Sequence, residues 1–351
     1  PVLETGGAIS TPRVWRAPDA EDPACVFFTS GSTGDPKGAV CPHRALTSLL
    51  SQPDFAVYDT STVTLQSAAL PWDAFALELW GALVNGGCCV LPPEEPLGPV
   101  ELRGFIERDG VNTLFLTTSL FNTLVDVAPR SFAGLKQLMT GGERISVPHV
   151  RAFMTQHPGI SLIHAYGPVE ATIFTTTHRI HASDLTAGTL DIPIGRPVRG
   201  AEVCVLDTNG RPVRPGETGE LHVLGNGLCL GYFADVRETA RRFVPISGGS
   251  GRYAYRTGDL VRVGLEGILS HVGRVDRQVK IRGVRIEPGE IEAVMREHPG
   301  LSETVVVPVK DASGRVVALH GWFMGAETEA ADLRARVSRQ LPPAWVCLLY
   351  T

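Results

Sequence analysis

The pattern of apolar and polar positions divides the chain into a part where predicted strands alternate with helices and a part dominated by short predicted strands. Between about residues 22 and 180, short apolar runs alternate with longer stretches in which apolar residues recur at helical spacing. The runs predict strands at 24–29, 62–68, 87–91, 112–116, 135–139 and 160–164. The stretches between them predict helices at 43–51, 74–85, 99–109, 119–128 and 146–157. Because strands that alternate with helices build wound α/β layers, we expect such a layer, with binding loops at the carboxyl ends of its strands.

The pattern of apolar positions changes after this layer. From about 190 to 275, short apolar runs are separated by turn signals such as Asn209-Gly210 and Pro215-Gly216, which predicts a β-rich part. A last unit begins near 276, with a hairpin at 278–286 and a helix that carries Pro288 in its first turn. It continues with strands at 303–309 and 315–323 and a helix at 327–340, whereas residues 1–21 are typical of a linker. We therefore expect a large domain at 1–275, made of an α/β layer (22–185) and a β-rich part (190–275), and a small α+β domain at 276–351.

Composition narrows the function classes. The chain has 351 residues, enough for about two or three domains. Its 32 basic and 37 acidic residues give a net charge of −5, and no apolar run reaches the length of a membrane span, so neither a nucleic acid nor a membrane is expected as a partner. The seven cysteines include no Cys-x-x-Cys pair, which favours buried thiols in a reducing cytoplasm.

A loop rich in glycine and hydroxyl residues is the first candidate for chemistry. It runs from Thr29 to Gly38 (Thr-Ser-Gly-Ser-Thr-Gly-Asp-Pro-Lys-Gly) and follows the apolar run 25–28, which predicts a buried strand ending in a mobile loop. Glycines let backbone N–H groups approach a ligand, and Lys37 adds a positive charge, so the loop suits phosphate oxygens. It differs from the common nucleotide loop because Pro36 precedes Lys37. Composition alone fits a flexible turn equally well.

The order of residues in this loop resembles the signature of the adenylate-forming superfamily, which contains adenylation domains of nonribosomal peptide synthetases, acyl-CoA synthetases and firefly luciferase. Three later segments resemble motifs of the same family in the same order: 166–170 (Tyr-Gly-Pro-Val-Glu), 255–260 (Tyr-Arg-Thr-Gly-Asp-Leu) and 273–283. The resemblance covers nearly the whole chain. It implies the luciferase-like fold and the cofactors ATP and Mg²⁺.

The resemblance also implies residue roles. Thr29 and Lys37 would act on the phosphates, Glu170 would help to hold Mg²⁺, and Asp276 would be the hinge on which the small domain rotates between adenylate and thioester formation. Tyr166 would pack near the adenine, Asp259 would bind the ribose and Arg274 would approach the nucleotide. The full nucleotide set is Thr29, Ser30, Gly31, Ser32, Thr33, Gly34, Lys37, Gly142, Glu143, Tyr166, Gly167, Asp259 and Arg274.

Two residues depart from the family pattern. His164 stands where the family has asparagine, and Val169 stands where it has a threonine whose hydroxyl lies near the adenylate phosphate. The loss of one hydrogen bond costs about 0.5–1.5 kcal/mol net, and more if the bond strengthens in the transition state. We therefore expect weakened rather than abolished activity from Val169.

Asp73 distinguishes amino-acid activation from fatty-acid activation. In the segment 72–75 (Trp-Asp-Ala-Phe) it stands where amino-acid-activating members bind the α-ammonium group. An unpaired buried carboxylate would be costly in an enzyme with no ammonium to bind. The alternative is a helix N-cap, which also favours aspartate.

Alignment of the flanking family motifs indicates which residues line the pocket for the side chain of the amino-acid substrate, and all of them are apolar. Since none of these residues could pair with a polar side chain, the pocket implies a hydrophobic amino acid. The same residues could equally be plain core. They are Ala74, Leu77, Phe115, Met139, Gly141, Ala165, Ile173 and Phe174.

The ends of the family's domain have no counterpart in this sequence. The family's catalytic lysine lies in a Gly-Lys near the end of the small domain, whereas the four lysines here are at 37, 136, 280 and 310 and the sequence stops at Thr351. The family's N-terminal segment upstream of the phosphate loop is also largely missing. We therefore expect slow or no adenylation by this stretch of sequence alone, because the lysine stabilises charge in the first step.

The combined expectation is ATP-dependent activation of a hydrophobic amino acid as aminoacyl-AMP, followed by its transfer to the phosphopantetheine thiol of a carrier protein. Neighbouring synthetase domains are expected partners, and the need for a small activator protein stays open. Two alternatives remain: a module that binds nucleotide or amino acid without turnover, and an aryl- or acyl-CoA ligase.

Overall fold

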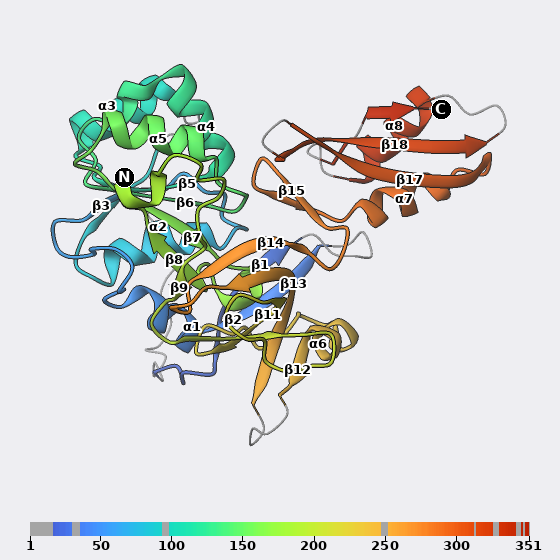
Figure 1. Cartoon of the computed structure of the whole chain (residues 1–351), viewed down its shortest axis with the longest axis horizontal. Helices are drawn as coiled ribbons and strands as arrows, with labels where there is room; N and C mark the ends of the chain where they lie inside the picture. The colour runs from blue at the N-terminus through green and yellow to red at the C-terminus, as the bar shows by residue number, and fades with distance from the viewer. Residues whose placement is uncertain are drawn as a thin grey trace, which may run out of the picture.

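The computed structural model describes residues 17–29, 36–92, 98–246, 252–311, 314–325, 330–341, 345–346 and, by backbone, 348–350. We call the described residues up to 275 the body and those from 276 onward the arm. Figure 1 shows the arm at one side of the body, joined to it beside the hairpin of β15 (Val279–Ile281) and β16 (Val284–Ile286). None of the helices in these described ranges is long and apolar enough to cross a membrane.

A seven-stranded sheet forms the centre of the body, in the order β4-β3-β5-β6-β7-β8-β9. The strands from β4 to β7 pair in parallel, and β8 and β9 join antiparallel. Both faces of its middle strands are buried, as in parallel sheets generally: Leu138 and Leu162 on one face and Met139 and Ile163 on the other are at most 1% exposed. The strands are β3 (Val63–Leu65), β4 (Cys88–Val90), β5 (Thr113–Thr117), β6 (Gln137–Gly141), β7 (Ser161–Tyr166), β8 (Thr176–Arg179) and β9 (Arg196–Pro197).

Helices connect these strands, and Figure 1 shows α3, α4 and α5 gathered over one side of the sheet. Local sequence sets their ends: α3 begins at Pro99, whose missing N–H is no loss in a first turn, and ends at Gly110 in the left-handed region (φ 74°). The helices of the body are α1 (His43–Leu50), α2 (Ala74–Leu83), α3 (Pro99–Asp109), α4 (Thr118–Val127), α5 (Val147–Gln156) and α6 (Val236–Arg242). Three short 3₁₀ turns are η1 (Pro129–Phe132), η2 (Val169–Ala171) and η3 (Ala182–Leu185).

The β-rich part packs against this sheet. Its strands follow the order β10-β11-β13-β12, and β14 also pairs with β13. Leu221, Tyr255 and Val261 fill the core that it shares with the sheet. The strands are β10 (Ala201–Leu206), β11 (Thr218–Gly225), β12 (Phe243–Pro245), β13 (Tyr253–Val263) and β14 (Leu269–Arg274).

The arm has a core of its own, built around Ile286, Met295, Val306 and Leu333. A β15–β16 hairpin precedes it, and β17, β18 and β19 form its three-stranded sheet. The elements are β15 (Val279–Ile281), β16 (Val284–Ile286), α7 (Pro288–Arg296), β17 (Leu301–Lys310), β18 (Val316–Gly325), α8 (Ala330–Gln340) and β19 (Leu348–Tyr350).

One predicted strand has a different role from the one expected. The strand at 24–29 was expected to be buried in the wound layer, yet β1 (Pro23–Thr29) pairs antiparallel with β2 (Lys37–Pro42) in a separate hairpin. Only one of its faces is covered, because Phe27 is buried and Phe28 is 51% exposed. A continuous apolar run therefore does not prove that both faces of a strand are buried, because one face of β1 is exposed to solvent.

Candidate active site

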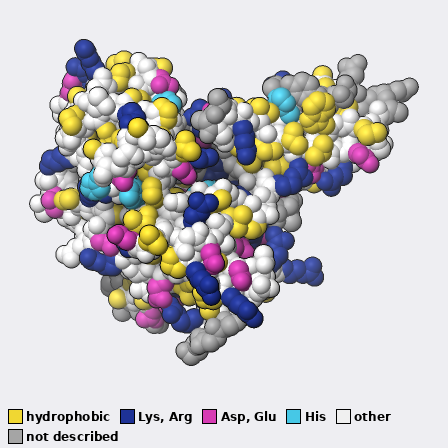
Figure 2. Space-filling view, viewed as in Figure 1, with side chains coloured by type: hydrophobic (Ala, Val, Ile, Leu, Met, Phe, Trp, Pro, Cys, Tyr) yellow, Lys and Arg dark blue, Asp and Glu magenta, His cyan; other side chains and the backbone are white. Residues whose placement is uncertain are grey.

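A cavity of about 740 Å³ lies where three surfaces meet: the carboxyl ends of β5, β6 and β7, the β-rich part, and the arm's hairpin. Figure 2 shows the molecular surface hollowed between body and arm. Twelve of the residues predicted for the site lie in its wall: Thr29, Asp73, Ala74, Phe115, Gly142, Ala165, Tyr166, Gly167, Ile173, Phe174, Asp259 and Arg274. The fold thus brings together motifs that are far apart in the sequence.

Other predicted residues lie elsewhere. Leu77 and Met139 are buried in the body core and, like Gly141, are not part of the cavity wall. Glu143, Glu170 and Asp276 contact residues that do line it, as described below. Ser30, Gly31, Ser32, Thr33 and Gly34 lie outside the described residues.

Lys37 is not part of the cavity wall. Its Nζ lies 3.2 Å from Oε1 of Glu238 on α6 and 5.8 Å from the ring centroid of Tyr232. The side chain is only 9% exposed, so this ion pair is largely sheltered from water. In the arrangement seen here its charge is neutralised by the body rather than directed at a ligand.

The Asp73 carboxylate lies in the cavity wall, just before α2. It makes no capping hydrogen bond to its own helix, and its Oδ2 accepts from the backbone N–H of Ile173 at 3.1 Å. Burial raises the pKa of Asp73 to about 6, against the lowering effect of that bond and of the Lys280 charge. A carboxylate in such a place is poorly solvated and gains from a cationic ligand.

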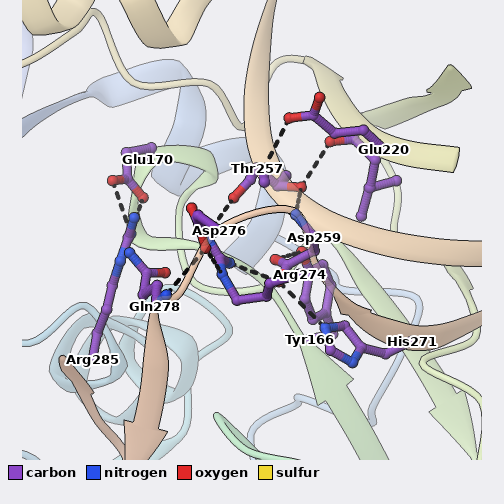
Figure 3. Close-up of polar contacts among 12 residues, drawn as sticks. Tyr166, Glu170, Glu220, Thr257, Asp259, His271, Arg274, Asp276, Gln278 and Arg285 are labelled. Atoms are coloured by element: carbon purple, nitrogen blue, oxygen red, sulfur yellow. Dashed lines mark hydrogen bonds and ion pairs between the residues drawn. The ribbon is translucent and has the colours of Figure 1, made fainter. Parts of the chain in front are cut away.

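A second polar cluster lines the cavity around Asp259 (Figure 3). The Tyr166 hydroxyl donates to Asp259 Oδ2 at 2.6 Å, Arg274 donates to Oδ1 at 2.7 Å, and Nε2 of His271 is 3.3 Å from Oδ1. Burial would raise the pKa of Asp259, but His271, Arg274 and Lys280 hold it well below its usual range. Asp259 is therefore an ionised acceptor beside the aromatic ring of Tyr166.

Arg274 links this cluster to the predicted hinge. Besides Asp259, it donates from Nε and Nη2 to the two carboxylate oxygens of Asp276, at 2.6 and 2.8 Å. Its Nη2 also reaches the carbonyl of Thr257 at 3.1 Å. A bidentate guanidinium–carboxylate pair fixes both groups in one geometry, so Asp259 and Asp276 share one cation (Figure 3).

Glu170 is fully buried on η2. Tyr232 donates its hydroxyl to Oε1 at 2.6 Å, and Arg285 of the arm donates from Nη1 to both oxygens, at 3.1 and 3.3 Å. Burial would raise the pKa of Glu170, but the Arg285 charge and the Tyr232 hydrogen bond lower it. A single ionised carboxylate of this kind suits Mg²⁺, which commonly takes one or two carboxylates and completes its shell with water and substrate phosphates.

The arm contributes two basic cavity residues that the sequence analysis did not assign, Lys280 and Arg285. Burial lowers the pKa of Lys280, while Asp259 and Asp73 raise it, so its ammonium group is attracted by both acids. Both residues lie in or just after the 273–283 motif, which marked the hinge. The sequence shows only that Lys280 and Arg285 lie on one face of a predicted hairpin. It does not indicate which part of the molecule that face contacts.

The turn of the same hairpin touches the body. The backbone N–H of Gly283 donates to Oε1 of Glu143, whose carboxylate also accepts from the Ser119 hydroxyl at 2.8–2.9 Å. Glu143, which the sequence analysis predicted to lie near the nucleotide, thus accepts from the hairpin turn in this structure. At Gly283 (φ +79°) an added Cβ would lie 2.9 Å from Cγ2 of Thr117.

A second cavity of about 430 Å³ begins on the other side of this turn. Arg282 and Arg315 of the arm face Ser119 and Thr123 of α4 across it. Thr117 lines both cavities. The two spaces therefore approach one another at Thr117 and Gly283.

The chain resembles proteins of known class. The family described as "AMP-binding enzyme" matches residues 4–233. Tyrocidine synthase 3 of Brevibacillus parabrevis is 37% identical over 335 residues, covering 94% of this chain and 5% of that protein. Surfactin synthase subunit 1 of Bacillus subtilis (strain 168) is 38% identical over 327 residues, covering 92% of this chain and 9% of that protein.

Solved structures agree. Holo-PA1221, a nonribosomal peptide synthetase protein with adenylation and PCP domains bound to a vinylsulfonamide inhibitor, superposes with a TM-score of 0.87 at 38% identity. The match covers 97% of this chain and 58% of that one. The Vibrio cholerae adenylation domain AlmE in complex with glycyl-adenosine-5'-phosphate gives 0.83 at 26% identity, covering 95% of this chain and 64% of that one.

The chain belongs to the AMP-binding enzyme family and has the adenylate-forming fold of nonribosomal peptide synthetase adenylation domains. The family and fold implied by its motifs are thereby confirmed. The chain spans less than a tenth of the length of the two synthetases named above.

Proposed function

We propose that this chain activates an α-amino acid with ATP, forming aminoacyl-AMP and pyrophosphate, and passes the aminoacyl group to a carrier-protein thiol. One observation carries the proposal: a single cavity is lined both by a partly desolvated carboxylate, Asp73, and by the Tyr166–Asp259–Arg274 cluster. The first suits an α-ammonium group and the second a nucleoside with two ribose hydroxyls. An amino acid and a nucleoside joined through a phosphate are an aminoacyl adenylate.

The residues divide the work as follows. Asp73 binds the ammonium group, Asp259 accepts from the ribose, and Tyr166 packs on the adenine. Mg²⁺, held by Glu170 and the substrate phosphates, would neutralise phosphate charge when bound. Thr29 lies in the cavity wall, and with Lys37 and the loop between them it forms the proposed phosphate-binding segment.

ATP–pyrophosphate exchange tests this function. We expect exchange that depends on an added amino acid and is lost in Asp73→Asn at neutral pH. Exchange driven by aryl or fatty acids but not by amino acids would instead support an acyl-CoA ligase. Asp73 argues against that class, because such substrates have no ammonium group to compensate the buried carboxylate.

We further propose a hydrophobic side chain for the amino acid. The wall next to Asp73 is apolar, and two of its rings pack together: the Phe115 and Phe174 centroids are 5.6 Å apart. Ala74, Ala165 and Ile173 complete this wall. A polar side chain would lose its hydrogen bonds to water here without replacement. Exchange measured with a panel of hydrophobic, polar and charged amino acids tests this point, and preference for a charged one would contradict it.

The carrier protein's phosphopantetheine would enter through the second cavity. Arg282 and Arg315 could receive its phosphate, and the thiol would then pass Thr117 and Gly283 to reach the first cavity. The relatives in holo-PA1221 and PA1221 contain adenylation and PCP domains in one protein, which supports a carrier as partner. Neighbouring synthetase domains are proposed as further partners on the same basis.

Substitution of Gly283 tests this route. Gly283→Ala would push a methyl group against Thr117 and strain a left-handed turn, so we expect aminoacyl transfer to a carrier to fall far more than pyrophosphate exchange. Gly289→Ala is the control, because nothing lies within 4 Å of the added Cβ. An equal fall in both half-reactions would indicate general damage rather than a blocked path.

Two structural features support a second candidate, a module that binds its ligands without turnover. Val169 lines the cavity without a hydroxyl, and His164 is buried with Nδ1 2.8 Å from the Pro193 carbonyl. Calorimetry with ATP and a nonhydrolysable aminoacyl-adenylate analogue distinguishes the candidates. Tight binding without exchange would favour the module.

The two-domain arrangement is part of the proposal. The separate core of the arm supports a boundary between residues 1–275 and 276–351, and the Arg274–Asp276 pair at that boundary supports Asp276 as the hinge. The six described cysteines are all free, which suits the reducing environment of the cytoplasm.

A further inference from the structure

Three cysteine thiols gather in the core of the body. Cys25 and Cys41 stand directly opposite each other on the antiparallel strands β1 and β2, which Figure 1 shows side by side. A third thiol approaches from another segment: the hydroxyl oxygen of Thr172 lies 3.3 Å from Sγ of Cys41 and 4.0 Å from Sγ of Cys229. Cys41 and Cys229 are buried, whereas Cys25 is half-buried. Of the three, Cys25 is therefore the thiol that solvent reaches most easily.

The thiols interact with one another. Hydrogen bonds from Cys229 and Cys25 lower the pKa of Cys41, against the effect of burial. The same contact with Cys41, together with burial and the charge of Asp73, raises the pKa of Cys25. Because the thiolate is the nucleophile in sulfur chemistry, Cys41 is prepared to attack an oxidised sulfur at its side.

The spacing of the two strands at this cysteine pair follows from their neighbours. Val40 on β2 turns both of its backbone groups away from β1: it donates to the Gly231 carbonyl at 2.9 Å and accepts from the Leu230 N–H at 2.9 Å. The adjacent pair of Cys25 and Cys41 is therefore of the wider, hydrogen-bonded kind. A disulfide needs Cβ atoms about 3.8 Å apart, whereas such a pair stands at roughly 5.5 Å, so closing it draws one strand toward the other.

β1 is the strand that would move. β2 is fixed on its far side by backbone hydrogen bonds to the segment 230–233. β1 ends at Thr29, which lies in the cavity wall. The Phe28 N–H of β1 also donates to the carbonyl of Pro71 at 3.2 Å, just before Asp73. A shift of β1 would therefore reach both the predicted phosphate-binding segment and the segment that carries Asp73.

We propose that Cys25 and Cys41 form a reversible disulfide on reaction with hydrogen peroxide, and that this disulfide weakens the binding of ATP. The effect on ATP rests on the function proposed above, whereas the formation of the disulfide does not. A disulfide closed across a pair that is too wide stores strain, and strained disulfides are readily reduced. The cysteine pair is thus a modification site whose state follows the supply of peroxide and thiols.

The chemistry balances in two steps. The Cys25 sulfur, its proton passed to the Cys41 thiolate, attacks one peroxide oxygen; the O–O bond breaks, Cys25 becomes a sulfenic acid, and the departing hydroxide takes the proton from Cys41 and leaves as water. The Cys41 thiolate then attacks the Cys25 sulfur; the S–S bond forms, the S–O bond breaks, and solvent protonates the second hydroxide. The thiol pair is oxidised and the peroxide is reduced to water.

Mass spectrometry of the peroxide-treated chain tests the modification without an assay of activity. Trypsin cuts after Lys37 and so separates the two cysteines, and we expect their peptides to be joined and to be released by dithiothreitol. Cys25→Ser and Cys25→Ala should both lose this cross-link, with folding checked by thermal denaturation. Cys204→Ser is the matched control, because it removes another half-buried thiol, on β10, and it should keep the cross-link. Absence of a cross-link, or a cross-link of Cys41 to Cys229, would overturn the assigned pair.

Calorimetric titration with ATP tests the effect on the site. We expect the peroxide-treated chain to bind ATP roughly tenfold more weakly than the reduced chain, as for the loss of one charge-assisted hydrogen bond, and dithiothreitol to restore the affinity. The two Cys25 variants should bind ATP like the reduced chain, with or without peroxide. Cys204→Ser should respond to peroxide as the unaltered chain does.

The outcomes distinguish the modification from the proposed function. If the disulfide forms and both forms of the chain bind ATP equally well, the coupling is refuted. If the reduced chain does not bind ATP, the proposed function fails and the coupling fails with it, while the disulfide is still decided by the cross-linked peptides. If peroxide weakens ATP binding in the Cys25 variants too, another oxidised residue causes the loss and the coupling is again refuted.

Discussion

Asp73 shows how burial prepares a single residue for its ligand. Its pKa lies near 6 in the folded chain, above the usual value of 3.8, because burial disfavours the charged form. As pH rises the unfolded chain therefore loses this proton first, and the contribution of Asp73 to stability falls between about pH 4 and 6 and stays low above. An ammonium ligand would offset this cost. Ionised Asp73 therefore destabilises the chain without substrate, whereas with substrate bound it pairs with the ammonium group.

The first prediction concerns the pH dependence of amino-acid binding. Because the ammonium group pairs with the ionised carboxylate, affinity should rise as pH increases through about 6 and level off above it. Calorimetric titration of the preferred amino acid between pH 5 and 8 measures this curve. Asp73→Asn should bind weakly at every pH, without the inflection. A curve of the same shape in that variant would assign the titration to another group.

A second residue-scale prediction concerns Asp259. Its ionised carboxylate already accepts from Tyr166 and Arg274, and its remaining lone pairs are available to ribose hydroxyls. Asp259→Asn should lower the affinity for AMP by roughly tenfold, as loss of one charge-assisted hydrogen bond implies. Binding of 2',3'-dideoxy-AMP should change much less. Equal losses for both nucleotides would show that Asp259 only supports Arg274 and does not bind the ribose.

At the scale of elements, local sequence decided most of what forms. The five helices predicted for the α/β layer all exist with ends within three residues of those expected, because prolines, glycines and apolar spacing specify them locally. The short strands β8 and β9 were not predicted, since their pairing depends on the neighbouring β7 rather than on a long apolar run. The hairpin role of β1 was missed for the same reason: pairing partners are a tertiary property.

The candidate site was predictable only in part. Motif resemblance predicted Asp73, Tyr166 and Asp259 as site residues, and the structure places them just before α2, at the end of β7 and within β13, all in the wall of one cavity. Motif resemblance did not assign Lys280 or Arg285 to the cavity. Which face of the β15–β16 hairpin contacts the body depends on the position of the arm, and the local sequence does not specify that position. Leu77 and Met139 were predicted to line the pocket but are buried in the core. Alignment predicts where a residue stands along a helix or strand, but it does not predict how deep the neighbouring cavity extends.

Helix α3 offers a prediction of opposite signs within one element. Gly104 lies in its interior, where an added Cβ has only Arg108 Nη1 within 4 Å, at 3.9 Å; Gly110 ends it with φ +74°. Gly104→Ala should stabilise the chain by up to about 1 kcal/mol, because alanine restricts the unfolded chain and favours the helix. Gly110→Ala should destabilise it by about 1 kcal/mol, the cost of a left-handed alanine. Urea denaturation measures both, and changes of the same sign would contradict the assigned helix end.

At the scale of the whole molecule, the arm is held against the body by few polar contacts. Among the described residues these contacts include Glu143 with Gly283, Glu170 with Arg285, and Arg274 with Asp276, and each has one partner in the wall of the main cavity. The arm otherwise has its own core. Such a design lets the arm change position without unfolding, because few buried apolar contacts have to break.

The last prediction concerns the Arg274–Asp276 pair at the hinge. The two side chains are 15% and 30% exposed, so solvent screens part of their attraction, and we assign the pair only about 1 kcal/mol of net stabilisation. Asp276→Ala should therefore raise hydrogen exchange of the 279–286 hairpin about fivefold and increase the radius of gyration in small-angle scattering, while the melting temperature changes little. Transfer to the carrier should fall more than pyrophosphate exchange, because the hairpin contacts that guide the thiol form less often.

Arg277→Ala supplies the comparison for this hinge variant. Arg277 is the next residue, but it pairs inside the arm, with Glu292 Oε1 at 2.8 Å and with the carbonyl of Val306. Its loss should lower the stability of the arm without changing the scattering of the folded molecule. If both variants loosened the hairpin equally, the arm's own stability rather than the hinge pair would set its position, and Asp276 would be a structural residue like its neighbour.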